Sequence, residues 1–296
     1  MKLKAFLLFF LLSSFSLLQA SDKPLIKIET ERTSLIYQVA DNGRLYQKYL
    51  GHDSDIQYLP QGTEAYLTHG MEDYFEPAIH IRHNDYNSSL LLKYVDHSSN
   101  NTGNGINETV ITLKDDKYPV TVKLHYVAYD KENIIRTFTE ISHEEKKPVI
   151  LSKYASSMLH LNSSKYFLTE FSGDWAHEAN VTERELAFGK KVIDTKLGAR
   201  ANMFVSPFFQ LALDNPSQEN AGEVLVGTIG WTGNFRFTFE VDNKNELRII
   251  SGINPYDSEY SLPAKEVFRT PDFYFTYSTQ GKGEASRSFH DWARNH

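Results

Sequence analysis

Cysteine is absent from the whole chain of 296 residues. Without thiol groups the protein can form no disulfide framework, no thiolate metal site and no lipid attachment through a cysteine. Its stability must therefore come from packing and hydrogen bonding. A chain of this length with 41% apolar residues can bury a core large enough to supply that stability.

Positive charge is also scarce. The chain carries 31 lysines and arginines against 38 aspartates and glutamates, which gives a net charge of -7, and no basic stripe runs along it. Because nucleic-acid phosphates are bound by clustered lysine and arginine, this composition argues against a nucleic-acid partner.

Long apolar runs are missing except at the N-terminus. There Lys2 and Lys4 precede the apolar segment from Ala5 to Leu18, and the small residue Ala20 follows. This order of charge, short apolar core and small residue predicts a signal peptide over residues 1–20, cleaved near Ala20. Since the apolar core is short for a membrane span, a membrane anchor is the weaker interpretation. We therefore expect a periplasmic or secreted protein with no membrane association in its mature form.

Proline contributes only 10 residues, whereas tyrosine and phenylalanine contribute 17 and 19. Aromatic and β-branched side chains favour pleated sheets, so this composition favours strands. Two hairpins stand out in the pattern. Residues 34–39 and 44–50 flank an Asp-Asn-Gly turn, and residues 120–129 and 134–142 flank a turn that contains Asp and Asn.

Further short segments alternate between apolar and polar residues in the manner of strands. They lie at residues 78–83, 110–113, 149–158, 208–213, 223–228, 235–241, 247–250 and 273–277. Residues 283–294 show the one helical pattern of any size. Two stretches, 88–105 and 174–206, are expected to be long irregular loops. The chain is thus predicted to be all-β, a large sandwich of two antiparallel sheets with a short C-terminal helix.

Composition alone does not locate an active site. The 38 acidic residues could include the carboxylate pair that glycoside hydrolysis needs, but no spacing singles out one pair. His80 and His83 are three apart in a predicted strand and should point to opposite faces, which weakens a metal hypothesis. No Gly-x-Ser-x-Gly segment supports a serine nucleophile. We assign no catalytic residue, no metal ligand and no cofactor.

The C-terminal third of the chain carries the strongest family signal. It contains Trp-Thr-Gly-Asn-Phe at 231–235, Gly-Ile-Asn-Pro-Tyr-Asp at 252–257 and Thr-Pro-Asp at 270–272. These motifs resemble the closing strands of the N-terminal domain of bacterial α-galactosidases, glycoside hydrolase family 36. Within this set, Trp231 and the Asn254 corner are expected to be structural, because Asn-Pro favours turns.

The resemblance implies a domain organisation and a parent reaction. Residues 21–282 would form a β-supersandwich of the galactose-mutarotase-like type, and residues 283–296 would begin a linker helix to a catalytic barrel that this sequence lacks. The implied parent reaction is the retaining hydrolysis of terminal α-D-galactosides, such as raffinose-type sugars. The family's nucleophile segment, Lys-aromatic-Asp, does not occur in the sequence. We therefore expect the non-catalytic N-terminal domain of a secreted α-galactosidase.

The stretch from Phe171 to Glu178, FSGDWAHE, resembles the family motif Gly-Ala-Trp-x-Arg-Glu, whose tryptophan reaches the sugar-binding site from the N-terminal domain. The resemblance makes Trp175 the candidate substrate-binding residue. An indole at a loop tip offers a flat apolar face to sugar C–H groups and one N–H donor. Asp174 and His177 depart from the motif, so the loop can bind differently. In the alternative interpretation Trp175 simply fills the edge of the sandwich.

Two earlier segments fit the family less closely. Tyr49-Leu50-Gly51 resembles a Tyr-x-Gly segment that precedes a sugar-contacting Asp in the family, but neither Asp53 nor Asp55 matches that residue. The stretch at 70–77 resembles Gly-x-x-Asp-Phe-Arg-x-Pro, and its Asp73 is expected to order a turn rather than to contact sugar.

Two other functions remain open from the sequence. The chain could be a stand-alone carbohydrate-binding or interaction module without hydrolytic activity. It could also associate with a separate catalytic barrel or with copies of itself. A barrel partner predicts an exposed apolar patch, for which Phe289 and Trp292 in the terminal helix are the candidates.

Overall fold

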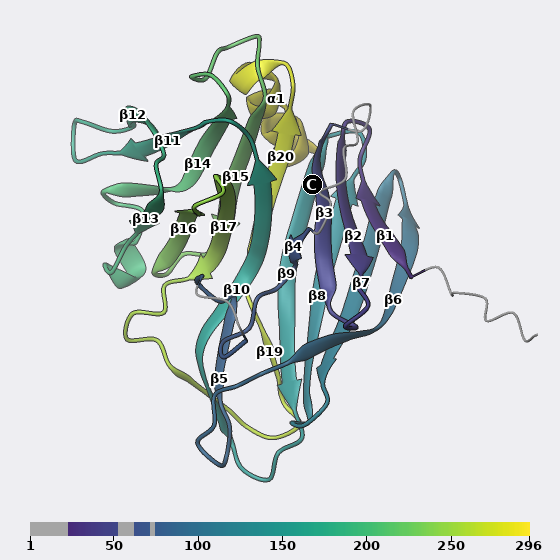
Figure 1. Cartoon of the computed structure of the whole chain (residues 1–296). Coiled ribbons are helices and arrows are strands. Elements are labelled where there is room, and N and C mark those ends of the chain that lie inside the picture. The colour runs from purple at the N-terminus through teal and green to yellow at the C-terminus, as the bar shows by residue number, and fades with distance from the viewer. Residues whose placement is uncertain (1–22, 53–61, 72–74) are drawn as a thin grey trace, which may run out of the picture.

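The computed structural model describes residues 23–52, 62–71 and 75–296 (Figure 1). The predicted signal peptide at 1–20 and the residues Asp53, Asp55 and Asp73 lie outside these described residues. In the described part of the chain, no helix has both the length and the apolar character needed to cross a membrane.

The named strands all pair antiparallel and form three sheets within the described residues. A four-stranded sheet has the order β1-β2-β3-β4, formed by Leu25–Glu29, Thr33–Val39, Leu45–His52 and Thr63–Glu64. A six-stranded sheet has the order β13-β16-β17-β10-β18, with β5 also paired to β10, formed by Gly189–Asp194, Phe235–Val241, Glu246–Ile253, Val149–Asn162, Tyr260–Leu262 and Ile79–Arg82. A ten-stranded sheet has the order β12-β11-β14-β15-β20-β9-β8-β7-β6, and β19 also pairs with β9. In that order, with β19 last, its strands are Asn180–Glu185, Tyr166–Ser172, Val205–Leu213, Val224–Gly230, Asp272–Ser278, Ile134–His143, Val120–Tyr129, Ile106–Asp115, Leu92–Gly103 and Val267–Arg269.

The two smaller sheets together form the layer that faces the ten-stranded sheet (Figure 1). Tyr37 of β2 packs on Tyr126 of β8 with ring centroids 5.5 Å apart, which joins the four-stranded sheet to the ten-stranded one. Phe209 of β14 packs on Phe237 of β16 at 5.2 Å, which joins the six-stranded sheet to it. The predicted all-β antiparallel sandwich is therefore confirmed, with one of its two layers built from two sheets.

A cluster of fully buried phenylalanines fills the space between β14, β15 and β20 on one side and β16 on the other. Its members are Phe209, Phe237, Phe239, Phe273 and Phe275. Gly227 on β15 makes room for this cluster, because an added Cβ would lie 2.6 Å from the ring of Phe209 and 2.7 Å from that of Phe273. Each buried phenylalanine contributes about 1.5–3 kcal/mol of transfer free energy, so the cluster contributes strongly to the stability of this half of the sandwich.

Buried polar groups join the two smaller sheets side by side. The Gln47 side chain donates to the backbone carbonyl of His160 at 2.7 Å and accepts from the His160 N–H at 3.1 Å. The His160 ring in turn bonds the Glu64 carbonyl at 2.9 Å. Burial, together with the nearby charge of Arg248, lowers the pKa of His160 to about 3, so this ring is neutral at physiological pH. The join needs no buried charge at this ring.

The C-terminal helix α1 (Gly281–Asn295) packs on the outer face of the ten-stranded sheet (Figure 1). Phe289 meets Phe208 of β14 with ring centroids 6.1 Å apart, and Trp292 meets Tyr274 of β20 at 4.7 Å and Tyr129 of β8 at 5.8 Å. Both side chains are half-buried, so the prediction that they form an exposed apolar patch is wrong. They cover apolar residues on the outer face of the sheet that would otherwise be in water.

The sequence placed most strands correctly and both hairpins are confirmed. β2 pairs with β3 across a turn in which Gly43 has a φ of +79°, and β8 pairs with β9 across a turn closed by Asn133. The expected loop at 88–105 is wrong, because Leu92–Gly103 is strand β6. From residue 95 onward β6 is exposed on both faces, so its serines and asparagines show no alternation of apolar and polar residues. Only its pairing with β7 shows that this segment is a strand.

The expected loop at 174–206 is wrong in part for the same reason. It contains β12 and β13 as well as a short 3-10 turn at Gly198–Arg200. All residues of β12 are exposed, so its charged sequence carries no apolar period.

Truncation of the helix aromatics tests whether α1 is an integral part of the domain. We expect Phe289→Ala and Trp292→Ala each to lower the free energy of unfolding by about 2 kcal/mol, roughly half the cost at a fully buried site. Arg287→Ala, an exposed position on the same helix, should change it by less than about 0.5 kcal/mol. Urea unfolding followed by circular dichroism measures all three. If Phe289→Ala and Trp292→Ala were as stable as Arg287→Ala, the helix would not be an integral part of the domain.

Candidate functional site

The hairpin of β11 and β12 carries Trp175 at its tip. β11 pairs with β14 on one side and with β12 on the other, and β12 forms one end of the ten-stranded sheet. Figure 1 shows this hairpin projecting from the body of the sandwich at the upper left. We refer to residues 171–188 as the arm. Just before the arm, Leu168 of β11 is still part of the main buried core.

The turn that holds Trp175 is closed by its own hydrogen bonds. The backbone N–H groups of Asp174 and His177 donate to each other's carbonyls at 3.2 and 2.9 Å. The Asp174 carboxylate accepts from the N–H of Trp175 at 2.7 Å, and the Glu178 carboxylate accepts from that of Ala176 at 3.2 Å. The turn is therefore held locally rather than by contacts of the indole.

The residues that shape this turn were missed by the sequence analysis, apart from Trp175. Asp174, which seemed only a departure from the motif, fixes the amide of Trp175. Gly173 allows the chain to close on itself, since an added Cβ would lie 3.1 Å from the Cα of Glu178. Ala176 and Ala179 adopt positive φ values of 60° and 55°, which are uncommon for residues with a Cβ. The Gly-Asp pair, a frequent turn former, was the available signal.

The indole of Trp175 is 86% exposed, so it does not fill the edge of the sandwich. Other large apolar side chains of this part of the chain are exposed too, namely Val181, Phe188, Leu197, Met203 and Phe204. The turn that carries Trp175 is tied to the segment 197–204 by a hydrogen bond from the Gly173 N–H to the Phe204 carbonyl at 2.9 Å. An exposed tryptophan on a rigid, locally bonded turn is suited to meet a ligand or a partner.

The motif at 70–77 docks onto the six-stranded sheet through Phe75 and Glu76. The guanidinium of Arg248 lies 3.5 Å from the centre of the Phe75 ring. The Glu76 carboxylate bonds the ammonium groups of Lys153 and, at 2.6 Å, Lys190. Burial raises the pKa of the Glu76 carboxyl, but the hydrogen bonds and charges of the two lysines outweigh burial and bring this pKa down to about 2. This segment therefore anchors the chain to the sheet.

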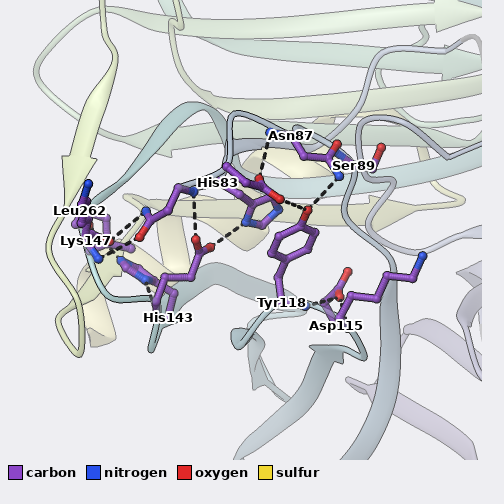
Figure 2. Close-up of polar contacts among 12 residues, drawn as sticks. His83, Asn87, Ser89, Asp115, Tyr118, His143, Lys147 and Leu262 are labelled. Carbon is purple, nitrogen blue, oxygen red and sulfur yellow. Dashed lines mark hydrogen bonds and ion pairs between the residues drawn. The ribbon is translucent and has the colours of Figure 1, made fainter.

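Figure 2 shows a second polar cluster, which contains His83 and Tyr118. The His83 ring stacks on Tyr118 with centroids 3.6 Å apart, and its Nδ1 lies 2.7 Å from the Glu145 carboxylate. The Tyr118 hydroxyl donates to Asp85 at 2.9 Å and accepts from the Asn87 amide at 2.8 Å. These contacts resemble a proton relay in their composition.

The surroundings of His83 argue for a structural role. His83 is only 3% exposed, and its contacts join its own turn to the turns that carry Tyr118 and Glu145. His80 contacts Ser152 and His69 instead, so the two histidines do not share a ligand. In the described part of the chain, no three histidine, aspartate or glutamate side chains gather in a way that could hold a metal ion.

The Asn254 corner is structural, as expected. Asn254 is 1% exposed, and its side chain donates to the Thr195 carbonyl at 2.9 Å and accepts from the Tyr256 N–H at 3.0 Å. Trp231 is 40% exposed and lies at the end of β15. In the early Tyr-x-Gly segment, Tyr49 and Gly51 lie within β3, where the Tyr49 hydroxyl donates to the His52 carbonyl at 2.5 Å.

The fold and the arm define a class of protein, a large antiparallel β-sandwich that presents an aromatic loop. Residues 31–263 match the family described as Glycosyl hydrolase family 36 N-terminal domain, and the chain belongs to this family. Alpha-galactosidase 2 of Pediococcus pentosaceus is 26% identical over 307 residues, which cover 91% of this chain and 42% of that protein. Alpha-galactosidase AgaA of Geobacillus stearothermophilus is 26% identical over 245 residues, which cover 78% and 33%.

Solved structures agree on the fold. The α-galactosidase from Lactobacillus brevis superimposes with a TM-score of 0.85 at 22% identity, covering 93% of this chain and 42% of that one. The family 36 α-galactosidase AgaA from Geobacillus stearothermophilus gives 0.83 at 22% identity, covering 92% and 43%. The chain thus spans about two fifths of the length of these proteins and corresponds to their N-terminal region.

The Glu76 anchor predicts a specific pH dependence of stability. Its carboxyl pKa is lowered from 4.5 to about 2, so its contribution is complete above 4.5 and is lost as the pH falls toward 2. We expect Glu76→Gln to be less stable than the parent by about 1 kcal/mol at pH 7, allowing for solvent screening. The difference should shrink in urea titrations as the pH is lowered from 4.5 toward 2. Glu185→Gln, which removes an exposed pair with Lys165, is the matched control and should have no effect. A difference independent of pH would contradict the anchor.

Proposed function

We propose that this chain is the non-catalytic N-terminal domain of an enzyme that hydrolyses terminal α-D-galactosides, and that Trp175 contributes to the sugar site. Its family membership and its relatives named α-galactosidase support the reaction class. One similar structure, an AgaA variant from Geobacillus stearothermophilus, is described in complex with raffinose. The proposal extends that chemistry to this chain.

The single observation that carries the proposal is the position of Trp175. Trp175 is 86% exposed, so a ligand or partner that covered its indole would gain free energy by removing apolar surface from water. Here the turn is closed by the Asp174 and Glu178 carboxylates, so the indole is held out without packing of its own. A preorganised aromatic face of this kind binds the C–H side of a pyranose with little loss of conformational entropy.

The catalytic carboxylates are proposed to come from outside this chain. The relatives have more than half of their length beyond the matched part, which is room for a barrel that carries the nucleophile. The exposed apolar side chains around the arm, such as Phe188 and Phe204, would then meet that barrel or another copy of the chain.

A second function, a stand-alone carbohydrate-binding module, is favoured by the same exposed Trp175. It requires no barrel and predicts that the isolated chain binds sugar tightly without hydrolysing it. Activity and binding measured on one purified sample distinguish the two functions.

The first test combines an aryl α-galactoside assay with tryptophan fluorescence of the purified chain. We expect no hydrolysis, and a change of indole emission on titration with galactose or raffinose. This change should be lost in Trp175→Ala and retained in Trp231→Ala, which removes another part-exposed tryptophan. A sugar that stacks on the indole should bind the parent roughly tenfold more tightly than it binds Trp175→Ala, as expected for a stacking contribution of about 1.4 kcal/mol.

Each result of this test has a distinct meaning. Hydrolysis that survives purification would overturn the non-catalytic function. An emission change that persists in Trp175→Ala would overturn the role of Trp175. Tight binding without hydrolysis would favour the stand-alone module.

Export is a separate part of the proposal, supported by the charged and apolar order of residues 1–20. We expect the protein recovered outside the cytoplasm to begin at Ser21. Intact-mass spectrometry of the native protein measures this start. A protein that retains Met1 would contradict export through a cleaved signal.

A further inference from the structure

A groove of about 420 Å³ lies on the outer face of the ten-stranded sheet, between the arm and helix α1. Its floor and one wall come from β11, β12 and β14. The other wall comes from the loop before β15 and the first turns of α1. Its volume is in the range of pockets that hold small organic ligands, about 300–1,000 Å³.

Strand register places a polar row and an apolar row side by side in this groove. Thr169 of β11 is paired with Glu183 of β12 and with Gln210 of β14, which makes a row of carboxylate, hydroxyl and amide. In the adjacent row, Phe171 is paired with Val181 of β12. The Phe171 ring also packs on Phe208 of β14 with ring centroids 5.4 Å apart, and this contact helps to fix the position of the Phe171 ring.

The Glu183 carboxylate is fixed in place but keeps one oxygen available. Its Oε2 accepts from the Ser217 N–H at 3.0 Å, the Ser217 hydroxyl at 2.5 Å and the Thr169 hydroxyl at 3.1 Å. Its Oε1 has no hydrogen bond from any described residue. A carboxylate held in this way can accept a hydroxyl donor without reorganising.

The opposite wall adds donors and acceptors from α1. Lys282 and Ser286 of α1 line this wall, across from Gln210 of β14, and none of these three side chains makes a hydrogen bond to another residue that the structure describes. Glu219 lies close to the helix, because an added Cβ on Gly283 would be 2.4 Å from its Oε1. These groups can both donate and accept, which suits ligand hydroxyls.

An anionic ligand fits this groove poorly. Glu183 and Glu219 outweigh the single ammonium of Lys282. The N-terminal amides of α1 are also occupied, since the N–H groups of residues 281–283 donate to the carbonyls of Gly222, Gln218 and Glu219, each at 2.9 Å. The amides that would favour a phosphate at a helix N-terminus are therefore not available.

We propose that this groove is a second carbohydrate-binding site, which takes a neutral mono- or oligosaccharide with its hydroxyls on Glu183, Gln210 and Lys282 and its apolar side on Phe171. The site is separate from the turn that carries Trp175 and does not rest on the proposed function. It gives the domain a second place to hold sugar, at the base of the arm rather than at its tip.

The test uses the whole chain with Trp175→Ala as background, so that the site at the arm tip does not contribute. Raffinose is titrated and followed by saturation-transfer NMR of the sugar. We expect saturable binding that weakens at least tenfold when Ser286→Phe fills the groove. Arg287→Phe, which adds the same side chain at the next, exposed helix position, should leave binding unchanged. Gln210→Ala should weaken it as well, and a thermal melt confirms that each variant is folded.

Two results would overturn this site. One is the absence of saturable raffinose binding in the Trp175→Ala background, and the other is equal binding by Ser286→Phe and Arg287→Phe. Binding of inorganic phosphate in preference to raffinose, lost in Lys282→Met, would also overturn it. These failures leave the proposed function intact, because that function depends on the fluorescence change at Trp175 and on the hydrolysis assay.

Discussion

The width of the ten-stranded sheet is the constraint on which the rest of the structure depends. Strands are spaced about 4.8 Å apart, so neither the four-stranded nor the six-stranded sheet can cover its inner face alone. The two must meet in the facing layer, and their junction leaves backbone groups in the core. Gln47 and His160 satisfy these groups with side-chain hydrogen bonds, and the neutral imidazole avoids a buried charge. This junction makes one continuous core possible.

The functional features lie where that core stops. β11 still contributes Leu168 to the core, whereas its neighbour β12 has no buried residue. The arm therefore begins on a rigid base and ends in water, which presents Trp175 without requiring it to pack. The outer face of the same strands carries the groove beside α1, since the helix covers only part of the sheet. Both candidate sugar sites thus follow from one end of the ten-stranded sheet.

The sequence predicted features that repeat locally and missed those that depend on distant pairing. Strands such as Phe235–Val241 have apolar residues in a period that burial requires, so the fold class could be predicted. β6 and β12 have no such period, because both are largely exposed and owe their conformation to neighbouring strands. Trp175 could be found by resemblance, but Asp174, which fixes its amide, could not be given a role without the turn. The groove draws on segments from Thr169 to Ser286, whose meeting depends on register and helix position.

Among the described residues the ten-stranded sheet is open, because no further strand pairs along the outer sides of its two terminal strands, β12 and β6. An open edge of this length is a template for strand addition and for fibril growth. Here β12 carries Glu183, Arg184 and Glu185, and β6 is interrupted by irregularities at Tyr94/Asp96 and Asn101/Gly103. Charged side chains on β12 and broken register on β6 oppose stacking of one molecule on the next. The polar sequences that hid these two strands from pattern analysis thus protect the protein from polymerisation.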